Sequence, residues 1–309
     1  MASKTLHITN GNQLTDYLKK LKYAGHFLTW QEMLCEGPTI EHIASRAFYN
    51  LRKEFLQECY DIEINKEELI EEMDILNHIE QFDEIILWFE YDLFCHINLI
   101  AVMNLLRQKG IELPLYLVCS GRVKGEKELK ALGELTPEQL QKHYTERIKL
   151  TEIDKDLMRS LWRIYCGKDH NLFKPFIVQN SSFPYLSNCL RAHLERFPDS
   201  KTGLSTLETH TLKMIADHNI KSTRHLLGYI LNFQGYYGFG DLQINRMISL
   251  LEIFYVQLDD RLVLNEKGRQ AIEHAHDFSS ELQSPMVFGG VKKLDFQFSK
   301  TENKLINTV

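Results

Sequence analysis

Two acidic side chains follow a continuous apolar run in the first half of the chain. Residues 82–96 read FDEIILWFEYDLFCH, and residues 85–89 within them are uniformly apolar. Such a run is typical of a strand that is buried on both faces. Glu90 and Asp92 lie two positions apart, so in an extended chain they would point to the same side. Two carboxyl groups at a buried strand end can perturb one another's pKa for acid–base catalysis, or they can bind a divalent cation through oxygen.

The same residues also have a purely structural interpretation. Asp92 could cap the helix predicted to follow, and Glu90 could pair with a buried Arg or Lys. Both interpretations stay open for the acidic pair. His96 lies at the start of the predicted helix; a packed, structural histidine is favoured there, and it is kept as a candidate ligand-binding residue.

Polar residues also follow three other segments with the character of strands. Residues 5–9 (TLHIT) run into Asn10-Gly11-Asn12, residues 25–30 precede Glu32 and Glu36, and residues 113–119 stop at Ser120. A strand, an Asn-Gly turn and a helix leave free backbone N–H groups that can hold an anion. The simpler alternative is that Asn and Gly only form the turn, because both tolerate positive φ.

The segments between these strands have helical spacing, which predicts a doubly wound, Rossmann-like α/β domain over residues 1–125 with a mostly parallel sheet. Ligands bind at the carboxyl ends of such strands. We therefore expect one site at this edge. The catalytic candidates are Glu90, Asp92 and Glu36, and the ligand-binding candidates are Asn10, Gly11, Asn12, Glu32, His96 and Ser120. No metal ligand is assigned, and the cofactor is unknown.

Several motifs in this order resemble the DUF1835 family, whose function is unknown. They are LHITNGN at 6–12, TWQEMLCEGP at 29–38, DEIILWFEYDLFCH at 83–96, LGELTPEQL at 132–140, PYLSNCLRAHLERFP at 184–198 and GLSTLE at 203–208. The family's first motif usually reads NGD, and its central motif usually has His before the Asp. Asn12 and Tyr91 depart from that pattern, which argues against catalysis through position 12. The resemblance implies that the motifs belong together, and it implies no reaction.

The second half of the chain has a different pattern. Residues 126–200 are predicted to be a helical linker region. Residues 201–309 contain three predicted helices and a hairpin around Asp259 and Asp260, which is the order of a winged helix. If this module bound DNA, the third of these helices would enter the groove, but its only cation is Arg246. Acidic residues near it and at the hairpin tip would repel phosphate, so nucleic-acid binding is not favoured.

Composition narrows the class further. The 309 residues include 36 Lys and Arg against 42 Asp and Glu, a net charge of −6, which does not favour a nucleic-acid binder. The sequence has neither an apolar run of about 20 residues nor a signal-peptide pattern, so we expect a cytoplasmic protein without a membrane span. The six scattered cysteines fit a reducing compartment.

Three functions remain open. The first is a small-molecule binding protein or enzyme that takes a phosphorylated or nucleotide-like ligand at the acidic edge of the sheet. The second is a ligand-sensing, transcription-associated protein that binds DNA through its C-terminal module. The third is a non-catalytic interaction or dimerisation adaptor, for which a homo-oligomer is an open alternative.

Overall fold

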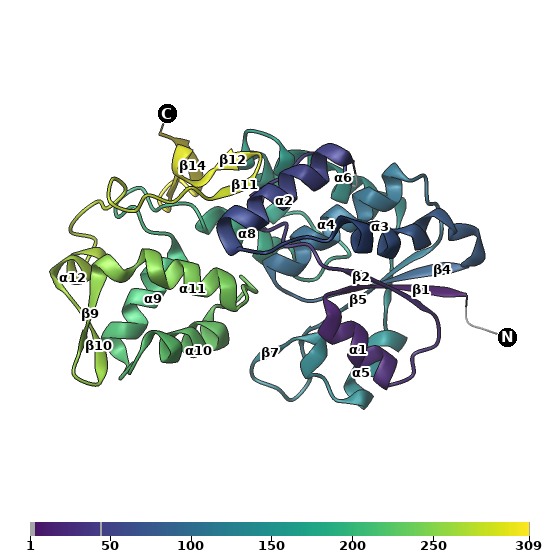
Figure 1. The fold of residues 1–309 in the computed structure, drawn as a ribbon, viewed down its shortest axis with the longest axis horizontal. Coiled ribbons are helices and arrows are strands. Elements are labelled where there is room, and N and C mark those ends of the chain that lie inside the picture. The colour runs from purple at the N-terminus through teal and green to yellow at the C-terminus, as the bar shows by residue number, and fades with distance from the viewer. Residues whose placement is uncertain (1–3, 44, 309) are drawn as a thin grey trace.

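A five-stranded sheet lies at the centre of the N-terminal half in the computed structural model, which describes residues 4–43 and 45–308 (Figure 1). Its strands, in spatial order, are β2 (His26–Trp30), β1 (Thr5–Asn10), β4 (Glu84–Phe89), β5 (Leu115–Cys119) and β8 (Ile148–Lys149). The first four are parallel, and β8 is antiparallel to β5. The predicted mostly parallel sheet is confirmed.

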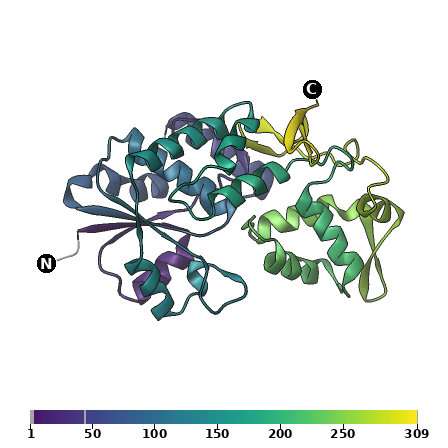
Figure 2. The ribbon, with the colours of Figure 1, turned by 180° about the vertical axis from the view of Figure 1, so that it is seen from behind.

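Helices cover both faces of this sheet (Figures 1 and 2). One face carries α1 (Asn12–Lys20) and α5 (Pro137–Thr145), and the other carries α2 (Arg46–Tyr60), α3 (Lys66–Asp74), α4 (Leu93–Gln108) and α6 (Glu152–Cys166). Alternation along β4 explains both layers. Ile86 and Trp88 pack with Leu14 of α1, whereas Ile85 and Leu87 join the larger core on the α4 side. A strand buried on both faces needs an uninterrupted apolar sequence.

The strand order reverses between β1 and β4. The chain passes from β1 to β2 on one side and then returns to β4 on the other side of β1. Helices that leave two such neighbouring strands lie on opposite faces, which opens a crevice at their carboxyl ends. In this chain that position is where Asn10 ends β1 and Glu90 follows β4.

The sheet extends beyond the boundary expected at residue 125, because β8 pairs with β5. Residues 126–200 are therefore not purely helical. They contain β7 (Leu129–Lys130), which pairs with β6 (Gly121–Arg122), and then α5, β8, α6, α7 (Lys174–Ile177) and α8 (Leu186–Glu195). The described residues also include short 3-10 helices at Ile75–Asn77, Ile79–Gln81, Leu132–Glu134, His170–Phe173, Glu252–Phe254 and Lys293–Asp295.

Three helices and a hairpin follow in the order expected from the sequence. They are α9 (Thr206–Asp217), α10 (Thr223–Phe233), α11 (Asp241–Leu250), and β9 (Tyr255–Leu258) paired antiparallel with β10 (Arg261–Leu264); α12 (Glu266–Ile272) comes next. A capping box starts α9, because the Ser205 hydroxyl accepts from Glu208 N–H while the Glu208 carboxylate accepts from Ser205 N–H.

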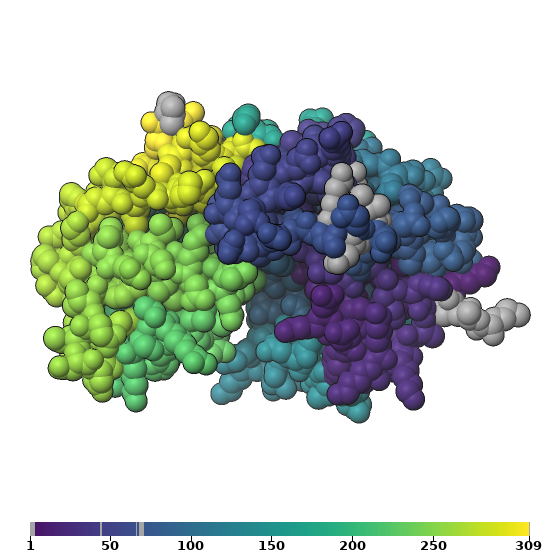
Figure 3. Space-filling model, viewed as in Figure 1, coloured from purple at the N-terminus to yellow at the C-terminus, as the bar shows by residue number. Residues whose placement is uncertain are grey.

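The C-terminal segment returns to the N-terminal half. β11 (Val287–Gly289) pairs with β12 (Val291–Lys292) and, in parallel, with β3 (Gly37–Pro38); β13 (Phe296–Ser299) and β14 (Lys304–Asn307) form a separate hairpin. In Figure 3 this yellow segment lies along the top of the molecule, against the green helices. No helix in the described part of the chain has the length and apolar composition to cross a membrane.

Candidate functional site

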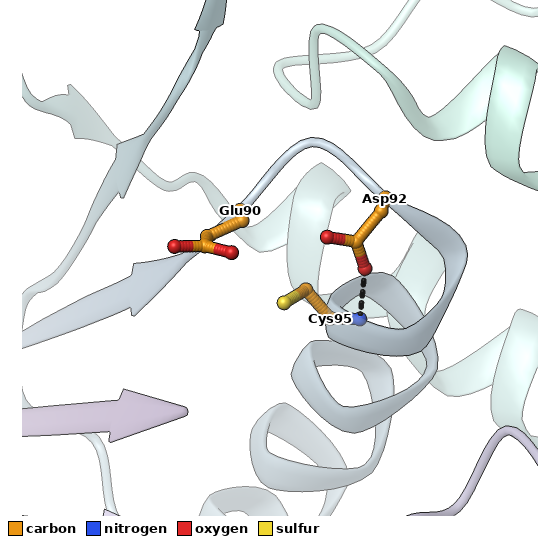
Figure 4. Close-up of side chains that lie close together, drawn as sticks. All are labelled: Glu90, Asp92 and Cys95. Carbon is orange, nitrogen blue, oxygen red and sulfur yellow. Dashed lines mark hydrogen bonds between the residues drawn. The ribbon is translucent and has the colours of Figure 1, made fainter. Parts of the chain in front are cut away.

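The turn between β4 and α4 positions the two carboxyl groups (Figure 4). The apolar strand ends at Phe89, and α4 begins at Leu93. Asp92 is the N-cap residue: its Oδ1 accepts from Cys95 N–H at 2.8 Å. This satisfies one of the N–H groups that every helix start leaves without a partner inside the helix. The structural role expected for Asp92 is thus present, together with its place at the edge of the sheet.

Glu90, Asp92 and Cys95 form one cluster. One carboxylate oxygen of each acid and the Cys95 Sγ all lie within 4.8 Å of one another. In Figure 4 the sulfur points toward the space between the two carboxylates. Neither acid forms an ion pair with Lys, Arg or His within the described residues. The pairing of Glu90 with a buried cation, the structural alternative, is therefore not found there.

Burial dominates the electrostatics of this cluster. Burial, together with the charge of Asp92, raises the pKa of Glu90 to about 7, although Leu132 N–H donates to its Oε1 at 2.8 Å. Burial raises the pKa of Asp92 to about 6 and that of the Cys95 thiol well above its usual range. Near neutral pH the pair can therefore both hold and accept a proton. The same two oxygen atoms and the sulfur atom could instead coordinate a metal ion.

Asn10 joins this cluster from the end of β1. Its Nδ2 donates to Cys95 Sγ at 3.1 Å, and its Oδ1 accepts from Asn98 Nδ2 at 2.8 Å. Asn98 also donates to Glu32 O and accepts from Leu34 N–H, so it ties the ends of β1 and β2 to α4. Sequence reasoning missed Asn98. An asparagine inside the apolar residues 97–106 was the available signal, since a buried amide needs partners.

Three more predicted residues lie at this edge. Gly11 has φ +89° and precedes α1, whose N-terminus has no side-chain cap; a Cβ built on Gly11 would have no atom within 4 Å. Asn12 is exposed at the first position of α1. Ser120 follows β5 and is buried, and its Oγ has no hydrogen-bond partner among the described residues. The edge therefore offers uncapped backbone N–H groups and a free hydroxyl.

Glu32 and Glu36 do not join the acidic cluster through their carboxylates. Glu32 forms a buried ion pair with Arg52 of α2, with 3.0 Å between Oε2 and Nε. Glu36 pairs with Arg246 of α11 at 2.9 Å and also accepts from the Tyr60 hydroxyl. The loop after β2 turns both side chains toward cations on neighbouring helices, which buried carboxylates require. The carboxylates of Glu32 and Glu36 are therefore the predicted groups that do not converge with Asn10, Glu90 and Asp92 at this edge.

His96 is a packed side chain that hydrogen-bonds at the start of α4. Its Nδ1 lies 2.9 Å from Asp92 O, and its buried Nε2 has no partner among the described residues. Burial lowers the pKa of His96 to about 4, so the ring is neutral at physiological pH. This geometry matches the structural role that was favoured for it.

A loop of the C-terminal module covers the cluster, and sequence reasoning did not anticipate it. The carbonyl oxygens of Tyr236 and Tyr237 accept from Leu93 N–H at 2.7 Å and from Phe94 N–H at 3.2 Å. Gly238 lies directly against the Asp92 carboxylate. The glycines of residues 235–240 (GYYGFG) were the only available signal. They do not predict this contact, because a simple turn explains them equally well.

Comparison with known proteins adds no assignment. None of the protein-family models searched matches the chain, and no curated protein matches it. The class of protein is therefore inferred from the fold and the site alone.

Proposed function

We propose that this chain binds a small phosphorylated or nucleotide-like ligand at the carboxyl ends of β1, β4 and β5. One observation supports this most strongly: the uncapped N-terminus of α1 and the carboxyl pair of Glu90 and Asp92 follow the adjacent strands β1 and β4, where the strand order reverses. In open α/β sheets this position is the usual ligand crevice.

Different groups at this edge would contact different parts of the ligand. A phosphoryl group fits the N-terminus of α1, because free N–H groups and the helix dipole favour negative charge. Glu90 and Asp92, with pKa values raised to about 7 and about 6, suit proton transfer at a neighbouring ligand atom. Asn10 holds the position of the Cys95 thiol between them. The proposal is an enzyme or binding protein of this ligand class, with acid–base catalysis as its chemistry.

The test is a thermal-shift screen of nucleotides, sugar phosphates and divalent cations on the full chain. Wild type is compared with Glu90→Gln, which keeps an acceptor for Leu132 N–H, and with Glu112→Gln. Glu112 is exposed and precedes β5 at the opposite end of the sheet, so it serves as a matched control. A ligand that binds only the native state raises the midpoint by mass action.

We expect one ligand class to raise the midpoint of wild type and Glu112→Gln alike and to act more weakly on Glu90→Gln. A response that is identical in all three proteins would place the ligand elsewhere. The absence of any response across the screen would contradict the proposed ligand class.

The C-terminal module is proposed to be winged-helix-like and to pack within the chain rather than on DNA. Support comes from α11, the helix that would enter a DNA groove: Arg246 pairs with Glu36, and Gln243 donates to Cys35 Sγ. Residues 205–280 also hold seven Lys and Arg against nine Asp and Glu, which is unfavourable for phosphate contacts. Membership of the DUF1835 family is a further proposal that rests on the sequence motifs.

A further inference from the structure

A polar cavity lies where the α/β half, α8 and the C-terminal module meet. The space open to the centres of water molecules is about 40 Å³. The charged and polar side chains that line it are Glu36, Arg196, Ser205, Glu208, Tyr237, Gln243, Arg246, Ser284 and Lys293. None of Glu90, Asp92 or Cys95 lines it, so this cavity is distinct from the acidic cluster.

Arg196 brings an uncompensated positive charge to this cavity. The side chain is 3% exposed, lies 4.0 Å from the Phe288 ring centroid, and forms no ion pair with an acid among the described residues. Its Nη1 donates to Cys35 O and its Nη2 to His193 Nδ1, but Nε has no partner within the described chain. A buried, charged N–H donor without an acceptor is costly, which points to an acceptor that occupies the cavity.

Tyr237 provides a second donor without a partner. It is 5% exposed and lines the same cavity, and its hydroxyl also has no hydrogen-bond partner among the described residues. Burial raises the pKa of Tyr237, with smaller effects from the charges of Glu195, Arg196 and Glu208. Arg196 and Tyr237 thus line the same small cavity, and each has one buried donor atom without a partner among the described residues.

The charge around the cavity favours an anion. Two of the three cations that line it have carboxylate partners: Lys293 pairs with Glu208, and Arg246 pairs with Glu36. Arg196 remains unpaired. We propose that this cavity binds a small oxyanion, with inorganic phosphate as the probe, and that Arg196 Nε and the Tyr237 hydroxyl donate to its oxygen atoms.

The size of the cavity limits the occupant. About 40 Å³ of this kind of space is roughly the room for three water molecules. It suits an anion with a few oxygen atoms, such as phosphate, sulfate or a short carboxylate, and excludes a nucleotide. The occupant is thus different from the ligand proposed for the edge of the sheet.

The test uses the full chain in thermal-shift and calorimetric titrations with phosphate, sulfate and acetate, against chloride at matched ionic strength. Tyr237→Phe removes only a hydroxyl that has no partner. It is therefore expected to fold at least as stably as wild type without the anion. Arg196→Gln is the second variant, and Arg191→Gln is the control, because Arg191 is exposed on α8 and near Arg196 in the chain.

We expect one oxyanion to raise the midpoint of wild type and Arg191→Gln, with binding at least tenfold weaker in Tyr237→Phe and in Arg196→Gln, because each loses a donor. Unchanged binding in Tyr237→Phe would overturn the proposal, even if Arg196→Gln fails to fold. So would a wild-type response to all anions no greater than to chloride, which would leave water as the occupant. A response that is lost in Glu90→Gln but retained in Tyr237→Phe would move the anion to the edge of the sheet and also overturn it.

Discussion

The backbone of Gly238 lies directly against the carboxylate of Asp92. A Cβ built on Gly238 would lie 2.2 Å from Asp92 Cγ, a distance that no real pair of carbon atoms of this kind adopts. The two preceding carbonyl groups, of Tyr236 and Tyr237, accept from the first N–H groups of α4. The loop of the C-terminal module therefore caps the N-terminal end of α4 and limits the space around the acidic pair.

Gly238→Ala is expected to destabilise the protein by about 2 kcal/mol or more, because strain at positive φ adds to the overlap with Asp92. Gly235→Ala is the matched control: both glycines have φ +68°, but a Cβ on Gly235 would have no atom within 4 Å. That variant carries the backbone strain alone, about 1 kcal/mol. Denaturant unfolding measures both. Equal losses in the two variants would mean that Gly238 does not contact Asp92.

Glu90→Gln is expected to be more stable than wild type at pH 8 and similar to it at pH 4. The pKa of Glu90 rises from 4.5 to about 7 on folding, so the native state binds more protons than the unfolded state between these values. Wild-type stability therefore falls as the pH rises through this window. The neutral amide removes that loss, a gain of about 1–3 kcal/mol above pH 7. Unfolding of both proteins from pH 4 to 8 checks this, and parallel curves would contradict a raised pKa.

The sheet could be predicted from sequence because buried parallel strands leave a local signal, a short apolar run such as residues 85–89 followed by polar residues. The expectation that Asn10 lies near Glu90 and Asp92 required only that their strands be parallel. The partners of Glu32 and Glu36 could not be predicted in the same way. Arg52 and Arg246 lie 20 and 210 positions away from them, and only tertiary packing brings those cations close. Gly238 and β8 were missed for the same reason.

The histidines of α8 and the preceding 3-10 helix are expected to form a neutral chain of fixed tautomers. Arg196 donates to His193 Nδ1, so His193 must donate through Nε2 to His170 Nδ1, 2.8 Å away, and His170 through Nε2 to Tyr165 O at 3.0 Å. Burial lowers the pKa of His170 to about 4 and that of His193 well below its usual range. Long-range ¹H–¹⁵N NMR should find both rings with the proton on Nε2 at pH 6.

His170 and His193 make the stability of the protein depend on pH in the opposite direction to Glu90. Between pH 6.5 and about 4 the unfolded state binds protons on these histidines that the native state does not bind. Their contribution to stability is therefore complete above pH 6.5 and falls as the pH is lowered toward 4. His170→Asn should reduce this acid-side loss. Titration of either ring near pH 6.5 in the native NMR spectrum would refute the assigned protonation.

Arg52→Lys is expected to cost about 3–5 kcal/mol, because it weakens a buried ion pair and the loop that the pair holds. The guanidinium has no exposed surface; it donates through Nε to Glu32, and through its other nitrogens to the carbonyl groups of Met33, Glu36 and Pro38. An ammonium group cannot reproduce this planar set of donors. Arg159→Lys is the control, since Arg159 forms an exposed pair with Asp156 at 3.5 Å and should change stability by less than about 0.5 kcal/mol. Denaturant unfolding of both variants decides the matter: a loss in Arg52→Lys no larger than in Arg159→Lys would mean that Arg52 does not hold residues 32–38 in place.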